Sequence, residues 1–323
     1  MRTRKLGSLE LTELGFGAAQ IGNLGRAVSD AEALDAVDAA WECGVRYFDT
    51  APHYGLGLSE RRLGLALAAR PRPQYVISTK VGRILEPNQT PCGSDLAHGG
   101  FAVPDELTRR FDFSADGVNR SLESSLERLG LDHVDVVYLH DPDDHLDQAI
   151  TEAVPALIEL RQQGVVGAIG VGINQWQAAL RMVLETDLDV VMLAGRWTLL
   201  DRSGAPLLAA CRARGVGVVA AAPFNSGLLS RRHPDPGARF NYLPVSRERL
   251  DAARKLAAIC ECYGLELPAA AVQFPLRDSA VVSVGCGLRN REQVLETVMR
   301  FSQQLPAALW AELDNATGTG DGG

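Results

Sequence analysis

Long hydrophobic runs are missing from this 323-residue sequence, and no apolar stretch reaches the roughly 20 residues that a membrane-spanning helix requires. The basic start MRTRKLGSLEL is not followed by the apolar core of a signal peptide. With 40 acidic against 32 basic residues, the net charge is -8, which disfavours binding to phosphate backbones and acidic membrane surfaces. These absences predict a cytoplasmic protein that binds neither nucleic acid nor membranes.

Clustered metal ligands are also missing. The six cysteines form no CxxC pair, and the two closest ones, Cys260 and Cys262, point to different sides of a predicted helix. The histidines include no HxH pair and no HExxH motif. In HDPDDH (His140 to His145), Pro142 and three acids suit a polar turn after a strand. The sequence therefore predicts reduced thiols and no metal site.

A full dinucleotide fingerprint is absent as well. The segments GFGAAQ, GVGINQ and GCGLRN begin as GxG but lack the third glycine of that motif, which makes a Rossmann domain a weak interpretation. GCGLRN nevertheless follows a predicted strand and opens a predicted helix, where backbone N–H groups and Arg289 or Arg291 could bind a phosphate. An exposed helix start explains these arginines equally well.

What the sequence does contain is one repeating pattern, in which a β-branched run is followed by a polar link and an amphipathic segment. This alternation predicts a parallel sheet covered by helices. Eight strands are predicted: Leu11 to Gly17, Val45 to Asp49, Tyr75 to Lys80, Val134 to His140, Val165 to Gly172, Val190 to Gly195, Gly215 to Phe224 and Ala280 to Gly285. Eight helices are predicted: Asp30 to Cys43, Ser59 to Ala69, Ala115 to Leu129, Leu146 to Gln163, Gln175 to Glu185, Ala205 to Arg214, Ser246 to Tyr263 and Arg291 to Phe301. The count favours a (β/α)8 TIM barrel, with an open doubly wound sheet as the alternative.

Three segments depart from this rhythm. The leading RKLGSLELTELG predicts a β-hairpin ahead of the first barrel strand. The turn-rich stretch from Val81 to Ser114 follows the third strand, and we expect it to form a long functional loop over the barrel mouth. The small, polar stretch from Asn315 to Gly323 predicts a disordered tail, which leaves residues 1–314 as a single domain.

Chemically useful side chains gather at the ends of the second, third and fourth predicted strands. The second strand ends at Asp49 with Tyr54 just beyond it, the third ends at Lys80, and the fourth ends at His140. Because active groups of such barrels lie at the carboxyl ends of neighbouring strands, all four side chains can converge on one pocket. The pattern therefore predicts one site built from four residues.

The residue types in this set suit proton transfer. A tyrosine, with an ordinary pKa near 10, is a poor proton shuttle at neutral pH unless a cation such as Lys80 stabilises its phenolate. The carboxylate of Asp49 would keep that lysine charged, and a neutral His140 can orient a substrate oxygen. Taken singly, each side chain has a simpler structural explanation: a loop cap, a surface ion pair, a packed ring or a hydrogen-bonded imidazole. Their joint placement favours an alcohol/carbonyl site that lacks only a hydride acceptor.

At this point the sequence resembles the aldo-keto reductases. The ordered segments FDTAPHYG, SERRLG, STK, YLH, GVGINQW, PFNSGLL and GCGLRNREQV match that family from about Leu6 to Arg300. VGR, FDFS, HDPDDH, NQWQ and AGRWTLLDRSG are most similar to its L-fucose or D-threo-aldose 1-dehydrogenase branch, close to pyridoxal and L-galactose dehydrogenases. The resemblance implies NAD or NADP bound across a barrel mouth. It also implies Tyr54 as general acid/base, Lys80 and Asp49 as its tuning pair, and His140 as the substrate-orienting residue.

The same resemblance implies a set of cofactor-binding residues. Asn174 matches the asparagine that holds the nicotinamide carboxamide. The other implied residues are Gly17, Phe224, Ser226, Gly227 and Leu228 toward the nicotinamide and pyrophosphate, and Gly285, Arg291, Gln293 and Glu296 toward the adenosine end.

Some cofactor positions depart from the common family pattern. Ala221 stands where an aromatic residue often stacks on the nicotinamide, so Phe224 or Trp197 would have to supply any stacking. Gly172 stands where serine is frequent, and Thr297 replaces a frequent adenine-contacting asparagine. The choice between NAD and NADP is therefore open.

The activity implied is oxidation of C1 of an aldose such as L-fucose, L-galactose or D-arabinose to the lactone, within carbohydrate metabolism. We expect His53, Arg83 and Trp176 to bind this sugar, with Phe101 from the long loop as part of the wall. A pyridoxal dehydrogenase and a general aldehyde or ketone reductase are alternatives within the family. A non-catalytic, nicotinamide-sensing subunit is an alternative of another class. The expected oligomeric state is a monomer or a small homo-oligomer.

Overall fold

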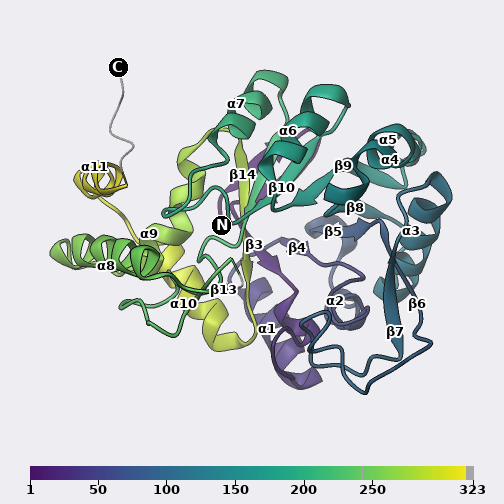
Figure 1. Cartoon of the computed structure of the whole chain (residues 1–323), viewed down its shortest axis with the longest axis horizontal. Helices are drawn as coiled ribbons and strands as arrows, with labels where there is room; N and C mark the ends of the chain where they lie inside the picture. The colour runs from purple at the N-terminus through teal and green to yellow at the C-terminus, as the bar shows by residue number, and fades with distance from the viewer. Residues whose placement is uncertain (242, 318–323) are drawn as a thin grey trace.

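Eight parallel strands close into a barrel at the centre of the structure, a computed structural model that describes residues 1–241 and 243–317 (Figure 1). Each strand pairs with the next barrel strand along the chain, and the last pairs with the first. The predicted (β/α)8 barrel is thus confirmed, and the open sheet is excluded. The barrel strands are β3 (Leu14–Gly17), β4 (Tyr47–Asp49), β5 (Val76–Val81), β8 (Val134–His140), β9 (Val166–Ile173), β10 (Val190–Ala194), β11 (Gly217–Ala221) and β14 (Val281–Gly287).

Helices surround this barrel (Figure 1) and bury alanine, leucine and valine side chains against it. The prediction of one helix from Leu146 to Gln163 is wrong, because a π-helical turn at Ala149–Ala153 divides it. Within the described residues the helices are α1 (Asp30–Glu42), α2 (Leu58–Leu67), α3 (Ala115–Leu129), α4 (Leu146–Gln148), α5 (Val154–Gln162), α6 (Trp176–Glu185), α7 (Ala205–Arg214), α8 (Arg247–Cys262), α9 (Leu267–Gln273), α10 (Arg291–Phe301) and α11 (Ala307–Ala316). Helices α9 and α11 are not predicted from the sequence, and both pack against α8.

The predicted N-terminal hairpin is present as β1 (Thr3–Leu6) and β2 (Leu9–Thr12). The strand predicted from Leu11 to Gly17 is in fact split between this hairpin and β3. Thr12 makes the break, since its hydroxyl donates to the Leu14 carbonyl oxygen at 2.8 Å and accepts from the backbone N–H of Tyr47 at 3.1 Å. Leu6 and Leu11 join the apolar side chains inside the barrel, so the hairpin covers the end of the barrel opposite the mouth.

The long loop predicted after the third strand is present as residues 82–113, and it is an insertion with strands of its own. It contains the antiparallel strands β6 (Arg83–Pro87) and β7 (Leu107–Phe111). Gly82 starts it with a φ of +97°, and a side chain at that position would overlap the Phe113 ring. Phe101 is buried in an apolar cluster with Leu56 and bridges to Leu24, which ties this insertion to the loops at the barrel mouth.

Two further segments complete the described residues. A short hairpin of β12 (Arg239–Phe240) and β13 (Leu243–Pro244) lies between β11 and α8. Asn315 and Ala316, which the sequence assigned to the tail, belong to α11, whereas residues 318–323 of that tail lie outside the described residues. None of the described helices is long and apolar enough to cross a membrane.

Candidate active site

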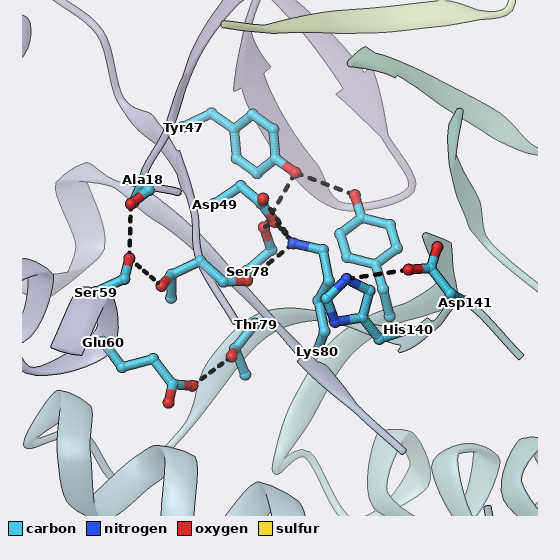
Figure 2. A network of polar contacts seen from close by, with 12 residues as sticks. Ala18, Tyr47, Asp49, Ser59, Glu60, Ser78, Thr79, Lys80, His140 and Asp141 are labelled. Atoms are coloured by element: carbon cyan, nitrogen blue, oxygen red, sulfur yellow. Dashed lines mark hydrogen bonds and ion pairs between the residues drawn. The ribbon is translucent and has the colours of Figure 1, made fainter. Parts of the chain in front are cut away.

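A buried ion pair lies at the carboxyl ends of β4 and β5 (Figure 2). The Lys80 ammonium donates to both carboxylate oxygens of Asp49, at 2.8 and 2.7 Å, and to the Thr50 carbonyl oxygen at 2.9 Å. Lys80 is 2% exposed and Asp49 is 6% exposed. The pair is therefore fully hydrogen-bonded where water is excluded, as a buried ion pair must be to persist.

A chain of hydroxyl groups, which runs from Ser78 to Tyr47 and Tyr138, also holds the Asp49 carboxylate (Figure 2). Ser78 donates to Asp49 Oδ1 at 2.7 Å, and the Tyr47 hydroxyl lies 3.1 Å from both the Ser78 hydroxyl and the Tyr138 hydroxyl. Because Asp49 pairs with Ser78 in the β4–β5 register, the barrel itself sets this geometry. Sequence reasoning missed Ser78, although its alternation with Lys80 on β5 puts both side chains on one face of that strand.

Burial by itself would lower the pKa of Lys80, but the Asp49 carboxylate, the nearby Tyr54 and hydrogen bonds with both raise it above its ordinary value. The lysine is therefore a permanent cation at neutral pH. Its ammonium lies 4.8 Å from the centroid of the Tyr54 ring. This places a fixed positive charge beside the phenol, as the sequence predicted.

Tyr54 is positioned by the turn between β4 and α2. Its backbone N–H donates to the Ala51 carbonyl oxygen at 3.1 Å. The next residue, Gly55, has a φ of +63°, and a Cβ there would overlap the Gly22 backbone. Ser59 fixes the other side of the turn, since its hydroxyl donates to the Ala18 carbonyl oxygen at 2.8 Å (Figure 2). The tyrosine is thus held by backbone contacts from two loops.

A buried carboxylate on α2 supports the third strand from outside the barrel. Glu60 is fully buried, accepts a hydrogen bond from Thr79 on β5 at 2.7 Å and pairs with Arg128 at 2.6 Å. The neighbours of Thr79 on β5 are Ser78 and Lys80, so this contact fixes the segment that holds the ion pair. This role of Glu60 is not predicted from the sequence, although its segment SERRLG is part of the family resemblance.

His140 ends β8 and lies close to the Tyr54 ring. Its ring centroid is 5.8 Å from that of Tyr54 and 5.5 Å from that of His53. Burial, followed by the positive charge of Arg83, lowers the pKa of both histidines well below the ordinary value. Both imidazoles are therefore neutral at pH 7, and Nδ1 of each is buried without a hydrogen-bond partner among the described residues.

Two arginines of the insertion line the same mouth. Arg83 forms an ion pair with Asp141, the residue after His140. Arg109 donates to both oxygens of Asp95, at 2.6 and 2.7 Å, and to the His53 carbonyl oxygen at 3.0 Å. The insertion therefore contributes cations to the mouth, and it fixes the backbone of His53.

Only some of the residues predicted to bind substrate lie close to Tyr54, Lys80 and His140. His53 and Phe101 lie together, with ring centroids 5.3 Å apart, and the cation of Arg83 acts on both histidines. Trp176, by contrast, begins α6 and packs partly buried against the main hydrophobic core. The structure thus brings His53 and Arg83 close to Tyr54, Lys80 and His140, whereas the described contacts of Trp176 are with the hydrophobic core.

The residues predicted to bind the nicotinamide and pyrophosphate follow the carboxyl ends of the remaining strands. Gly17 ends β3, and the Asn174 amide after β9 donates to the Ala194 carbonyl oxygen at 3.3 Å. Gly285, which is predicted for the adenosine end, lies in β14 beside β3. Phe224, Ser226, Gly227 and Leu228 follow β11. Phe224 is half-buried there, whereas the Leu228 side chain is fully buried in an apolar cluster with α8 and α9.

The loop after β11 has the features of a phosphate-binding segment. Asn225, Ser226 and Gly227 have φ values of +46°, +57° and +97°, a left-handed run that costs energy for residues other than glycine. Asn225 is 1% exposed, and its Oδ1 atom has no hydrogen-bond partner among the described residues. The left-handed backbone fits a loop that a ligand completes, whereas the unmatched Asn225 oxygen is an acceptor and needs a hydrogen-bond donor rather than a phosphate.

The adenosine end contains two arginines with different surroundings. Arg291 pairs with Asp35 at 2.8 Å and with Glu42 at 2.9 Å, so its charge is compensated on the outer surface of α1. Arg289 instead contacts the Gln20 amide oxygen and, at 2.7 Å, the Leu24 carbonyl oxygen, which are both neutral. Its Nε atom is buried without a partner among the described residues. Arg289 is therefore better prepared than Arg291 to receive a phosphate.

Two other residues predicted for the adenosine end are already hydrogen-bonded within α10. Gln293 accepts from the Arg289 backbone N–H at 3.0 Å, and Glu296 pairs with Arg300 at 3.0 Å. In the described part of the chain, no three His, Cys, Asp or Glu side chains gather closely enough to hold a metal ion.

A TIM barrel with a buried Lys–Asp pair beside a tyrosine and a neutral histidine at its mouth defines the class: a barrel oxidoreductase of the alcohol/carbonyl type. The chain belongs to the Aldo/keto reductase family, whose sequence profile matches residues 13–317. This membership confirms the resemblance noted in the sequence.

Individual relatives point in the same direction. A D-threo-aldose 1-dehydrogenase of Pseudomonas sp. is 48% identical over 95% of this chain and 94% of its own length. A pyridoxal 4-dehydrogenase of Microbacterium luteolum is 38% identical over 94% of both chains. Among solved structures, the holo form of an aldo-keto reductase from Bacillus halodurans covers 99% of this chain and 97% of its own, with a TM-score of 0.81 and 26% identity.

Proposed function

We propose that this protein oxidises C1 of an aldose to the lactone with NAD or NADP as hydride acceptor. The observation that carries the proposal is the Lys80–Asp49 pair beside Tyr54, with the neutral His140 ring also close to the phenol. The similarity to a D-threo-aldose 1-dehydrogenase over nearly the whole chain supports the choice of an aldose.

Tyr54 removes the proton of the anomeric hydroxyl as the C1–H bond breaks and the C1=O bond of the lactone forms. A bound nicotinamide supplies the acceptor for the hydride that leaves C1. The Lys80 ammonium stabilises the phenolate form of Tyr54, because an opposite charge within a few ångströms favours the ionised state. Asp49 keeps that ammonium charged and fixed in position.

His140 acts in this scheme as a neutral group. Its lowered pKa leaves one ring nitrogen with a proton, so the imidazole can donate a hydrogen bond to the substrate oxygen without carrying charge. Burial is the main cause of this state, and the nearby charges of Arg83 and Lys80 further disfavour an additional cation. His140 therefore orients the reacting oxygen toward Tyr54.

The dinucleotide fits along the strand ends from β9 to β14. Asn174 would hold the carboxamide, and the strained Asn225–Gly227 loop would receive the pyrophosphate. Of the two arginines that follow β14, we assign the phosphate contact to Arg289, because no described carboxylate pairs with it.

The substrate assignment is tested by steady-state oxidation of L-fucose, L-galactose, D-arabinose and pyridoxal, each with NAD and with NADP. We expect the aldoses to be oxidised with the higher kcat/KM. Turnover of pyridoxal alone, which the similarity to a pyridoxal 4-dehydrogenase makes the main rival outcome, would reject the sugar assignment. Activity only in the reducing direction, on aldehydes, would reject it as well.

A nicotinamide-sensing subunit without activity is the remaining alternative. It has no need for a complete proton-transfer set, and the four residues of that set lie together here. Its signature would be dinucleotide binding without turnover of any alcohol or carbonyl compound. A role in carbohydrate metabolism, a cytoplasmic location and a monomeric or small oligomeric state stay predictions from the sequence.

A further inference from the structure

An unassigned carboxylate, Asp141, lies at the mouth directly beside the catalytic histidine (Figure 2). Its Oδ2 atom is 3.7 Å from His140 Nε2. The Asp141 backbone has a φ of +46°, and its N–H continues the ladder between β8 and β9 by donating to the Gly172 carbonyl oxygen at 2.9 Å. The barrel thus fixes the backbone of Asp141 in a left-handed conformation that aspartate tolerates better than most residues.

Arg83 meets this carboxylate from the start of the insertion. The Arg83 side chain is 14% exposed, its guanidinium stacks over the Phe111 ring at 4.9 Å, and one of its terminal nitrogens pairs with Asp141 Oδ2. Its Nε atom is buried without a partner among the described residues. The Arg83 guanidinium, held by the Phe111 ring and by Asp141, therefore still has an N–H group that can donate to a ligand.

The ion pair therefore leaves hydrogen-bonding capacity on both partners. The Asp141 carboxylate is 31% exposed, and one of its oxygens lies within reach of the group that His140 orients. A carboxylate accepts two hydroxyl protons, and a guanidinium donates to a hydroxyl oxygen. Adjacent hydroxyl groups of a sugar ring supply this combination of donors and acceptors, whereas a simple aldehyde does not.

We propose that Asp141 and Arg83 form a specificity-determining pair that binds two adjacent hydroxyl groups of the aldose ring while His140 holds the oxygen on C1. This inference rests on the proposed aldose oxidation and extends it, because it names the residues that distinguish a polyhydroxylated substrate from other carbonyl compounds. Neither residue transfers a proton in the reaction.

The test compares Asp141→Asn with Asp144→Asn in the full-length protein. Asparagine keeps the shape and tolerates the left-handed backbone of residue 141, while Asp144 is an exposed acid of the same turn. We expect Asp141→Asn to lower kcat/KM for the best aldose by roughly 10- to 100-fold, mainly through KM, since a hydrogen bond to a charged group is lost. Reduction of benzaldehyde, which has no hydroxyl group, should change less than about 3-fold in both variants.

Single-deoxy analogues of that aldose identify the hydroxyls. The wild-type protein should discriminate against the analogue that lacks a contacted hydroxyl by roughly 10-fold or more, and Asp141→Asn should lose that discrimination. Arg83→Lys keeps the positive charge but loses the planar donor, so it should show the same loss.

Three outcomes would overturn the inference. If Asp141→Asn loses activity equally on the aldose and on benzaldehyde, Asp141 acts on His140. If the KM for the aldose is unchanged in that variant, Asp141 does not touch the sugar. If the variant still discriminates among the deoxy analogues, the pair does not recognise the hydroxyl groups. If the wild-type protein oxidises no aldose but reduces benzaldehyde, the proposed function itself fails. That result is distinguishable, because it is seen before any variant is made.

Discussion

The two halves of the barrel mouth differ in how their polar groups are satisfied. On the side of β4, β5 and β8, the Lys80 ammonium has three oxygen acceptors, and the Asp49 carboxylate is held by Lys80 and Ser78. On the side of β11 and β14, Asn225 has an unmatched buried oxygen and the Arg289 guanidinium has only neutral acceptors. The Lys80–Asp49 pair is complete within the protein, whereas the β11–β14 side keeps polar atoms without a partner among the described residues.

The two sides of the mouth are therefore prepared for catalysis in different ways. A proton-transfer group must be in place before the reaction, because reorganising a buried ion pair during turnover would cost several kcal/mol. A binding loop can store strain and unmatched polar groups that the ligand later satisfies. We therefore expect substitutions on the β4–β8 side to affect turnover, and substitutions on the β11–β14 side to affect dinucleotide affinity.

The largest effect should come from Tyr54→Phe, which removes only the phenolic oxygen. Turnover should fall by roughly 10³-fold or more, because the proton then has no acceptor at the reacting oxygen. Dinucleotide affinity, measured by fluorescence titration, should stay within about 3-fold of the wild-type value. Substantial residual turnover, or a parallel loss of affinity, would remove the proposed division between the two halves.

Lys80→Met should affect both activity and stability. Turnover should fall by roughly 100-fold because the phenolate loses its cation. The free energy of unfolding should fall by about 3–5 kcal/mol, because the buried Asp49 carboxylate loses its partner.

The double variant that also carries Asp49→Asn separates these two effects of Lys80. It should recover part of the stability in urea unfolding but none of the turnover. Equal recovery of both would mean that the lysine acts only through the fold.

A smaller effect is expected on the side of β11 and β14. There, Arg289→Gln is the test variant and Arg291→Gln is its control. Loss of Arg289 should raise the Kd of the dinucleotide by about 10-fold, since a charged contact to phosphate disappears. Loss of Arg291 should change it by less than about 2-fold, because that arginine pairs with Asp35 and Glu42. Titrations of both variants check this, and the reverse order would refute the assignment of Arg289.

The last prediction concerns the acid stability of the side formed by β4, β5 and β8. The unfolded chain protonates His53 and His140 below about pH 6.5, whereas the folded protein keeps both neutral, because burial and nearby cations lower their pKa values. Stability is therefore fully present above pH 6.5, and it falls below that pH by about 1.4 kcal/mol per pH unit for each imidazole.

Urea unfolding between pH 7 and pH 5 measures this dependence. His140→Asn should remove about half of the pH-dependent loss, whereas the exposed His98 of the insertion provides a control, since His98→Asn should leave the loss unchanged. Equal pH dependence in the wild-type protein and in His140→Asn would show that His140 is not held neutral.

Predictability from the sequence differed between these parts of the molecule. Strand ends carry a strong local signal, so Asp49, Lys80 and His140 could be assigned from a β-branched run that stops at a polar residue. The insertion carried no such signal, because β6 and β7 pair across a 19-residue connection, which here spans positions 88–106 and is rich in turn residues. Its contact with the mouth, through Arg83 and Arg109, was therefore missed in part.

The two arginines after β14 show the limit most clearly. In the sequence, Arg289 and Arg291 are equivalent candidates for a phosphate. Their difference depends on Asp35 and Glu42, which lie about 250 residues earlier, with sequence separations of 256 and 249 to Arg291. Only the packing of α1 against α10 brings those carboxylates to one arginine and not the other.

The sequence by itself determined the barrel and the family, and it picked out the four residues that we propose to be catalytic, because strand periodicity and strand-end chemistry are local properties of the chain. Tertiary structure alone decided which charges are compensated and which are left for a ligand, as at Asp141, Arg83 and Arg289. The reason is physical. The energy of a charged group depends on the burial and the partners that folding brings to it, and segments far apart in sequence supply both.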